Sequence, residues 1–355
     1  MYIFRVVLFM CLIQLGFCSV DSNLFPCQTL YKDDGSQSCE GKLPFPCTVH
    51  WLQERGDPGQ FISPGNFNVL WACSEPSLLL KSDEYYRSKS AEFDLIITNK
   101  RHLVRDNIIF SPGYVSLHTL VAQEVSKEFS VSYLLSLGWY KFSEQAKNQR
   151  LYRLRMQLWD LKEGIKSEIP QRFYSGRTNS DDLRRQEELD RYRMPPDGDK
   201  MHCFKSMFHI AFENACEENY ITEKIFQCFE TLTVPIYIGA PNIGEYFDLR
   251  GIFCASSPEH AIKICNSLTP EIYSQMLPFV MENKKRWDQM QEKYQIYNLI
   301  RTEFFKGIGE SERKQCLLKL SLPIPDIIEG ISQPKVHLLT YAGGGQKFII
   351  EIGKF

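Results

Sequence analysis

The sequence predicts an α/β protein built on parallel sheets. Segments with the periodicity of strands alternate with segments of helical periodicity over most of the chain, and this alternation is typical of strands joined by helical crossovers. Hydrophobic residues make up 43% of the sequence and aromatic residues 13%, which is enough for a packed core. A length of 355 residues accommodates two domains of ordinary size.

Apolar runs bounded by turn residues mark the strands, and amphipathic runs mark the helices. In chain order these are a strand at 67–72, a helix at 78–89, strands at 93–98 and 129–134, and a helix at 145–161. The charged stretch 175–200 is expected to be an exposed loop with a short helix. A β-α-β unit follows, with strand 208–212, helix 222–232 and strand 234–238, ahead of a helix at 259–268 and a helix-rich stretch to 320.

We expect two domains from this order of elements. The first covers residues 20–120 and opens with a leader rich in Cys, Pro and Gly; the second covers residues 121–316. Residues 317–355 form a tail in which two strand-like runs flank Gly343-Gly344-Gly345. This tail predicts either a hairpin or the start of a further unit.

The first 19 residues have the composition of a targeting segment. Arg5 precedes an apolar run from Val6 to Phe17, which is shorter than the roughly 20 residues that span a bilayer. The small residues after it suit signal-peptide cleavage near Cys18 or Ser19, and an uncleaved anchor is the alternative. In both cases we expect the chain in the secretory pathway, attached to a membrane only through this segment if it stays uncleaved.

Net charge and cysteine spacing bear on nucleic-acid binding, disulfides and metal sites. A net charge of -2 argues against a nucleic-acid partner, because such proteins usually carry a basic surplus. The 12 cysteines are compatible with disulfides in an oxidising compartment, and Cys27, Cys39 and Cys47 lie close together in the leader. Neither a CxxC pair nor an HxxxH spacing occurs, so we expect no metal site of these kinds.

A polar stretch, FENACEENYITEK at residues 212–224, separates a predicted strand from a predicted helix. Thr222 is a good N-cap residue, and the first turn of the helix would offer free N–H groups to an anion. Lys224 in that turn opposes the helix dipole by roughly 0.3–1 kcal/mol, and an anionic ligand would reverse the sign of this effect. The pattern therefore fits a phosphate-binding site, and a solvated surface loop is the alternative.

The pieces FEN at 212–214, YITEKI at 220–225 and VPIYIGAP at 234–241 together resemble the signature of the α1,3-fucosyltransferases. Weaker resemblance extends over most of residues 65–300. It implies two Rossmann-like domains facing across a cleft (GT-B type), GDP-fucose as donor, and inversion at the sugar carbon. It further implies a glycan or glycoprotein acceptor, an α1,3 linkage, a Golgi location, and no required cofactor, with a divalent metal ion stimulatory at most.

The resemblance also assigns roles to single residues. Lys224 and Arg155 would hold the pyrophosphate and Glu223 the ribose hydroxyls, while Tyr220 and Asn214 would frame the nucleotide and the sugar. Arg153 lies two residues from Arg155 and could exchange roles with it.

Inverting transfer also needs a base to accept the proton of the acceptor hydroxyl. Glu75 falls where the family places its catalytic carboxylate, although here it precedes Pro76, and a loop acid before a proline is the alternative. Glu213 is a second candidate for the base. Its place at a buried strand end could raise its pKa, and a structural hydrogen bond would explain the residue equally well.

The sequence is also compatible with two other functions. Asp197-Gly198-Asp199 is an Asp-x-Asp motif that could hold Mg²⁺ or Mn²⁺ in a metal-dependent glycosyltransferase. That motif should end an apolar strand, whereas Pro195-Pro196 precedes it here. The second alternative is an inactive carbohydrate-binding relative that keeps the fold.

Overall fold

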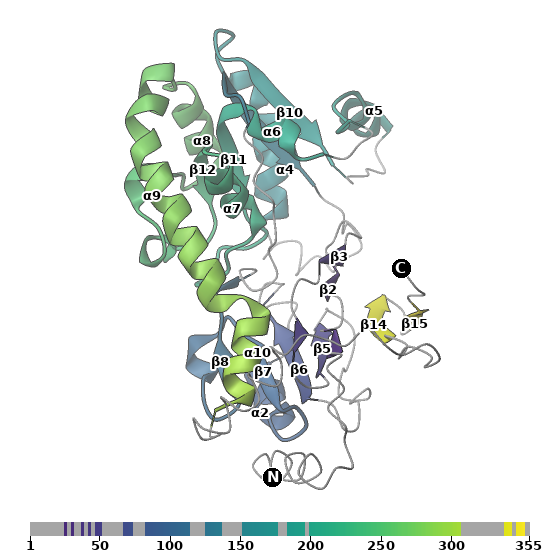
Figure 1. Ribbon diagram of the computed structural model, residues 1–355. Coiled ribbons are helices and arrows are strands. Elements are labelled where there is room, and N and C mark those ends of the chain that lie inside the picture. The colour runs from purple at the N-terminus through teal and green to yellow at the C-terminus, as the bar shows by residue number, and fades with distance from the viewer. Residues whose placement is uncertain are drawn as a thin grey trace, which may run out of the picture. The chain divides into compact units, whose positions relative to one another are not determined.

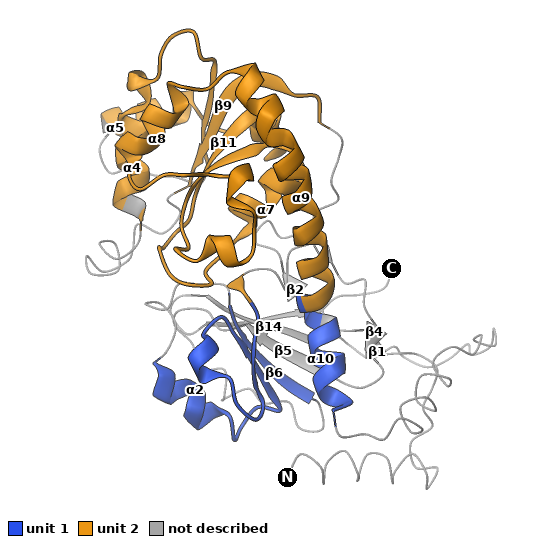
Figure 2. Cartoon of the chain, turned by 90° about the vertical axis from the view of Figure 1, so that its left-hand side faces the viewer, with its two compact units in different colours: residues 1–74, 80–111, 294–355 blue, residues 75–79, 112–293 orange. Residues whose placement is uncertain are grey.

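The computed structural model describes residues 67–73, 82–113, 125–136, 151–176, 183–195 and 199–306, together with the backbone of short strands within 25–51 and 337–351 (Figure 1). The chain divides into two compact units, shown in different colours in Figure 2. Unit 1 comprises residues 1–74, 80–111 and 294–355, and unit 2 comprises residues 75–79 and 112–293. Each unit contains a parallel sheet, which confirms the predicted α/β class.

Unit 1 is built on a four-stranded parallel sheet in the order β5-β6-β7-β8. Its strands are β5 (Cys47–Trp51), β6 (Phe67–Ala72), β7 (Leu95–Thr98) and β8 (Ile108–Phe110). Helix α2 (Asp83–Lys89) begins after Ser82, whose hydroxyl accepts the N–H of Tyr85. Helix α10 (Ile296–Phe304) lies on the opposite side of the sheet (Figure 2).

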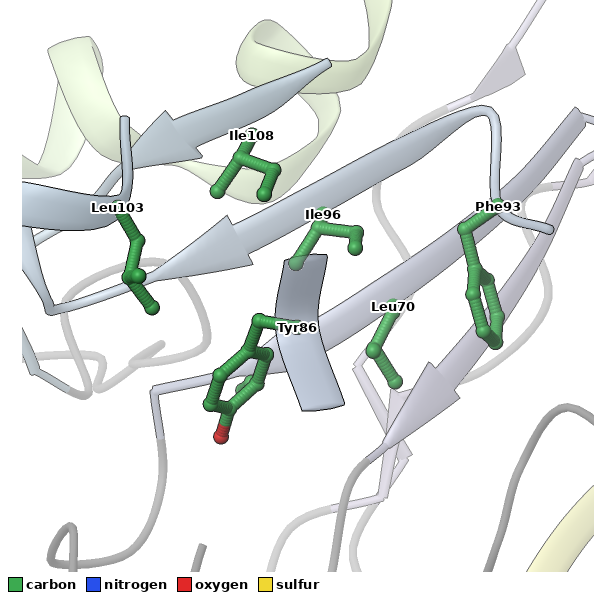
Figure 3. Packing of buried hydrophobic residues seen from close by; sticks show 7 residues of the cluster. Leu70, Tyr86, Phe93, Ile96, Leu103 and Ile108 are labelled. Atoms are coloured by element: carbon green, nitrogen blue, oxygen red, sulfur yellow. The ribbon is translucent and has the colours of Figure 1, made fainter. Parts of the chain in front are cut away.

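One hydrophobic core cluster of unit 1 lies between α2 and the sheet. Tyr86 of α2 packs against Leu70 of β6 and Ile96 of β7, which are paired across the two strands and so point to the same face (Figure 3). A short 3-10 helix, Arg101–Leu103, adds Leu103 to this cluster. Burial of each such side chain contributes about 1.5–3 kcal/mol.

Unit 2 is built on a five-stranded parallel sheet in the order β10-β9-β11-β12-β13. The strands are β9 (Glu128–Leu135), β10 (Gln171–Ser175), β11 (Ser206–Phe212), β12 (Val234–Ile238) and β13 (Phe253–Cys254). The helices are α4 (Tyr152–Asp160), α5 (Leu183–Arg191), α6 (Met201–Phe204), α7 (Glu223–Glu230), α8 (Pro258–Cys265) and α9 (Pro270–Tyr294). Short 3-10 helices lie at Lys162–Gly164, Ile243–Glu245 and Leu249–Gly251.

Helices cover both faces of this sheet. Figure 2 shows α4 and α8 on one face and α7 and α9 on the other. Helix α7 is fixed to α9 by the ring of Phe226, which stacks on Trp287 at 3.9 Å between centroids. The indole N–H of Trp287 donates to Glu230 at the end of α7. Because Phe226 and Glu230 fix α7 to α9, packing helps to determine the position of its first turn.

The boundary between the units differs from the one expected at residue 120. The chain enters unit 2 at Pro112 and returns to unit 1 at Tyr294, so α10 belongs to unit 1 although the sequence placed it in the second domain. The reason is packing: Phe304 of α10 contacts Phe67 of β6 edge to face, at 5.4 Å between ring centroids.

Three other segments test the predicted elements. Strand β10 was not predicted, because QRFYS carries little apolar signal beyond Phe173. The charged stretch 175–200 contains α5 as its short helix. In the tail, β14 (His337–Ala342) and β15 (Gln346–Glu351) pair antiparallel, as expected of a hairpin.

Two expectations about the termini and cysteines fall partly outside the described residues. The described residues include neither the targeting segment nor the side chains of Cys27, Cys39 and Cys47. Within the described part of the chain, no helix is both long enough and apolar enough to cross a bilayer. The cysteines described there, from Cys73 to Cys265, are free thiols.

Candidate functional site

The candidate site lies where β11 ends and α7 begins. Strand β11 is the central strand of the sheet, and ligands of open parallel sheets collect at the carboxyl ends of such strands. Thr222 is the N-cap of α7: its backbone is extended and its hydroxyl accepts the N–H of Lys224. The buried stripe of Ile225, Phe226 and Phe229 holds the rest of the helix in the core. The predicted helix start at Thr222 is therefore confirmed.

Glu213, the first residue after β11, is fully buried at 0% exposure. Its Oε1 accepts the main-chain N–H of Thr222 at 2.8 Å, and its Oε2 accepts the Thr222 hydroxyl at 2.6 Å. Burial raises the pKa of Glu213, while the charge of Lys224 opposes this rise. A Cβ at Gly239 would lie 2.5 Å from Cγ of Glu213, so the absence of a side chain there makes room for the carboxylate arm.

Lys224 lies between two carboxylates. Its Nζ is 3.2 Å from Oε1 of Glu223 and 3.6 Å from Oε2 of Glu213. Burial lowers the pKa of Lys224, but these carboxylates raise it by more, so the pKa lies above its usual value. Burial raises the pKa of Glu223, but Lys224 and then Lys200 outweigh this and bring it to about 2. Both side chains are therefore charged at neutral pH, and both remain partly exposed, at 19% and 26%.

Arg155 reaches the same place from α4. Its Nη1 donates to Oδ1 of Asn214 at 2.8 Å, and the N–H of Leu151 donates to the Asn214 carbonyl at 2.9 Å. The charge of Arg155 also acts to lower the pKa of Lys224, so the two cations share one environment. Arg155 is buried, whereas Arg153 is exposed on α4. Of the two arginines that the sequence left open, the structure brings Arg155 to the site.

The structure does not place two of the expected site residues, Tyr220 and Glu75, on the surface of the site. The sequence suggested that Tyr220 presents a flat face to a base or sugar, but its ring is only 1% exposed. Tyr220 is apolar over most of its surface, so the ring packs into the interior although Glu218 in the preceding turn is exposed. Glu75 lies outside the described residues.

Lys200 is a residue that the sequence reasoning missed. Its charge helps to lower the pKa of Glu223, which places a further cation within electrostatic reach of the site. It directly follows Asp197-Gly198-Asp199, and the sequence offers no signal that separates it from other lysines of the charged loop. Oδ1 of Asp199 accepts the N–H of Met201 at the start of α6. Among the described residues, no group of three His, Cys, Asp or Glu side chains could hold a metal ion.

Comparison with known proteins gives this geometry a context. Residues 176–304 match the model of the glycosyltransferase family 10 (fucosyltransferase) C-terminal domain. The matched range contains β11, α7 and β12, with Glu213, Asn214, Tyr220, Glu223 and Lys224. The resemblance to fucosyltransferases is thus confirmed for this part of the chain. Arg155 lies before the matched range, so only its structural contacts, and not the family match, assign it to the site.

Individual relatives share short segments with the chain. It is 47% identical over 49 residues to a putative fucosyltransferase-like protein of Arabidopsis thaliana, covering 14% of this chain and 10% of that protein. It is 42% identical over 50 residues to an α-(1,4)-fucosyltransferase of the same plant, covering 14% and 12%. It is 49% identical over 39 residues to GDP-fucose protein O-fucosyltransferase 3 of Xenopus laevis, covering 11% and 8%. The aligned segments thus span about a tenth of each relative's length.

Among solved structures, an α1,3-fucosyltransferase with GDP is similar to the chain at 14% identity and a TM-score of 0.38, over 65% of this chain and 76% of that one.

Proposed function

We propose that this chain is a fucosyltransferase that moves L-fucose from GDP-fucose to a hydroxyl group of an acceptor, with inversion at the sugar carbon. One observation carries the proposal: Glu223 and Lys224 pair at the N-terminus of α7, inside the range that matches the fucosyltransferase domain, and Arg155, which donates to Asn214, acts on the charge of Lys224. Partly exposed charged groups at the positive end of a helix dipole suit a nucleoside diphosphate.

In the proposed donor complex, the diphosphate lies against the first turn of α7. Lys224 and Arg155 supply positive charge, and the carboxylate of Glu223 accepts hydrogen bonds from the ribose hydroxyls. Asn214 is oriented by Arg155 and borders the nucleotide and the sugar. Tyr220 and Glu213 are buried, so we assign them to the support of this surface rather than to direct stacking or hydrogen bonding with the donor.

In the transfer step, the bond between the fucose anomeric carbon and the GDP oxygen breaks while the acceptor oxygen bonds to the same carbon from the opposite side. The electron pair of the broken bond leaves with GDP, and the acceptor proton passes to a base, for which we propose Glu75. Cations that meet the growing charge on the leaving diphosphate stabilise the transition state more than the ground state. This step requires no metal ion.

The proposed acceptor is a glycan or glycoprotein in the secretory pathway, most simply in the Golgi lumen, with an α1,3 linkage. Membrane attachment would come through residues 1–19 if they stay uncleaved. One relative is named for an α-(1,4) linkage, and another is named for transfer to a protein. A protein hydroxyl is therefore the second acceptor to test.

The test is incubation of the purified full chain with radiolabelled GDP-fucose and a panel of glycan and folded-protein acceptors, with and without EDTA. We expect label transfer that persists in EDTA. GDP binding without transfer or hydrolysis would favour the inactive relative instead. Loss of transfer in EDTA, with recovery on adding Mn²⁺, would favour the Asp-x-Asp enzyme.

A further inference from the structure

The four residues before α7, Asn219 to Thr222, are all buried, at 5%, 1%, 0% and 2% exposure. We call them the 219–222 segment. Asn219 has a φ of 63°, in the left-handed region that Asn tolerates better than most residues. The last residue, Thr222, is both the N-cap of α7 and the partner of Glu213. A shift of this segment would therefore move the first turn of α7 and its charged side chains.

Asn242, from the loop after β12, holds the start of the 219–222 segment. Its Oδ1 accepts the main-chain N–H of Asn219 at 2.9 Å, and its Nδ2 donates to Oδ1 of Asn219 at 2.9 Å. The hydroxyl of Tyr246 donates to the same Asn219 oxygen. These reciprocal hydrogen bonds fix both the backbone and the side chain of a residue in a strained conformation.

Gly113 restrains the same segment from a different part of unit 2. Its φ is 39°, and a Cβ on this residue would lie 2.0 Å from the carbonyl oxygen of Ile221 and 2.6 Å from its nitrogen. Both neighbours are backbone atoms, which cannot rotate away as a side chain can. Any larger residue at 113 must therefore displace Ile221, which lies between Tyr220 and Thr222.

We propose that Asn242 and Gly113 are positioning residues for nucleotide binding: together they hold the 219–222 segment so that Glu223 and Lys224 are presented in a single geometry. The inference rests on the proposed function, because it takes this surface as the donor site. The bonds and contacts given above tie Asn242 and Gly113 to the 219–222 segment and not to Glu223 or Lys224, so they are predicted to act through the segment. Preorganisation of this kind lowers the entropic cost of ordering the site when a ligand binds.

The test compares Asn242→Ala and Gly113→Ala with two matched controls in unit 2. Asn266 likewise accepts one hydrogen bond and donates one through its amide, in its case with the backbone of Lys166 and Gly164, so Asn266→Ala is the control for Asn242. Gly164→Ala is the control for Gly113, because a Cβ there first meets a side chain, Ile262, at 3.5 Å. The probe is GDP, with the dissociation constant measured by calorimetry, the KM for GDP-fucose measured alongside, and the melting temperature measured without ligand.

We expect Asn242→Ala to raise the GDP dissociation constant and the GDP-fucose KM about tenfold, the factor that corresponds to one or two lost hydrogen bonds. Gly113→Ala should raise both constants at least as much, because its Cβ displaces the backbone of Ile221. The two controls should stay within about twofold of the wild-type values. Equal GDP affinity in all four variants and wild type would overturn the inference, as would equal losses in the controls. Absence of GDP binding by the wild-type chain is a separate outcome, and it would overturn the proposed function first.

Milder variants keep the test decisive if either substitution prevents folding. Asn219→Gly retains a left-handed backbone and removes the side-chain oxygen that Asn242 and Tyr246 share. Tyr246→Phe removes a single hydroxyl. Both should raise the GDP dissociation constant by a smaller factor than Asn242→Ala, and wild-type affinity in both would contradict the role assigned to Asn242.

Discussion

Thr222 meets Glu213 through two hydrogen bonds, from its main-chain N–H and from its hydroxyl, although the two residues are nine positions apart in sequence. The buried carboxylate therefore stands at the N-terminus of α7, where the helix dipole favours negative charge. Both of its oxygens already accept hydrogen bonds from Thr222. This arrangement gives Glu213 a supporting role and makes it a poor candidate for the base that deprotonates an acceptor.

Glu213→Gln and Glu75→Ala should therefore affect transfer differently. Gln can still accept the Thr222 N–H, so we expect Glu213→Gln to lower kcat by less than about tenfold, with a fall in thermal stability. Loss of a general base costs roughly 10²–10⁴ in rate, so Glu75→Ala should keep GDP affinity and lose transfer. The measurement is kcat for fucose transfer beside the GDP dissociation constant. Normal transfer by Glu75→Ala, or a loss of this size in Glu213→Gln, would reverse the assignment.

Lys224→Ala should weaken donor binding. A charged hydrogen bond contributes about 1.5–3 kcal/mol, so we expect the dissociation constant of GDP to rise roughly 10- to 100-fold. Lys285→Ala is a suitable control, because Lys285 lies on α9 with 72% of its side chain exposed. Calorimetric titration with GDP measures both variants. Unchanged affinity in Lys224→Ala would remove Lys224 from the diphosphate site.

Arg155→Lys and Arg153→Lys separate the two arginines of α4. The guanidinium of Arg155 donates to Asn214 and presents further N–H groups in a planar fork, which a lysine ammonium cannot reproduce. We expect Arg155→Lys to raise the GDP-fucose KM about tenfold, the effect of one lost charged hydrogen bond. Arg153→Lys, on the exposed side of the same helix, should leave the KM near wild type. A larger effect from Arg153→Lys would favour the alternative that the sequence left open.

Much of this site follows from the sequence, because its strongest features are local. Apolar runs on both sides of FENACEENYITEK identified β11 and β12, and the N-cap preference of Thr222 located the start of α7. The choice of Arg155 also had a local signal. Arg155 lies three and four residues before Leu158 and Trp159, on the buried stripe of α4, whereas Arg153 does not.

Other features depend on contacts between distant parts of the chain. Periodicity cannot show that the Glu213 side chain turns back onto Thr222, or that Asn242 bonds to Asn219, because both depend on loop conformation. The return of the chain to unit 1 at Tyr294 was missed for a related reason. Helices α9 and α10 are amphipathic and almost continuous in sequence, and the pattern does not tell which sheet each one covers.

His209 gives a prediction about stability that is independent of the donor site. It lies on β11 with 5% exposure, and its Nδ1 is 2.8 Å from the hydroxyl oxygen of Ser132. Burial, with a smaller effect from the charge of Lys127, lowers the pKa of His209 from 6.5 to about 3. Between these values the unfolded chain binds a proton that the folded chain does not. The free energy of unfolding therefore falls as the pH decreases below 6.5, and the loss continues until about pH 3.

The size of this effect is about 1.4 kcal/mol for each pH unit in that window. Carboxylates also titrate there, so the informative quantity is the difference between wild type and His209→Gln, measured by urea unfolding at several pH values. We expect the variant to be less stable at pH 7 but to lose less stability on acidification, because its amide does not titrate. His260→Gln, at an exposed position on α8, is the control. Parallel pH profiles for wild type and His209→Gln would show that His209 is not the neutral buried group described here.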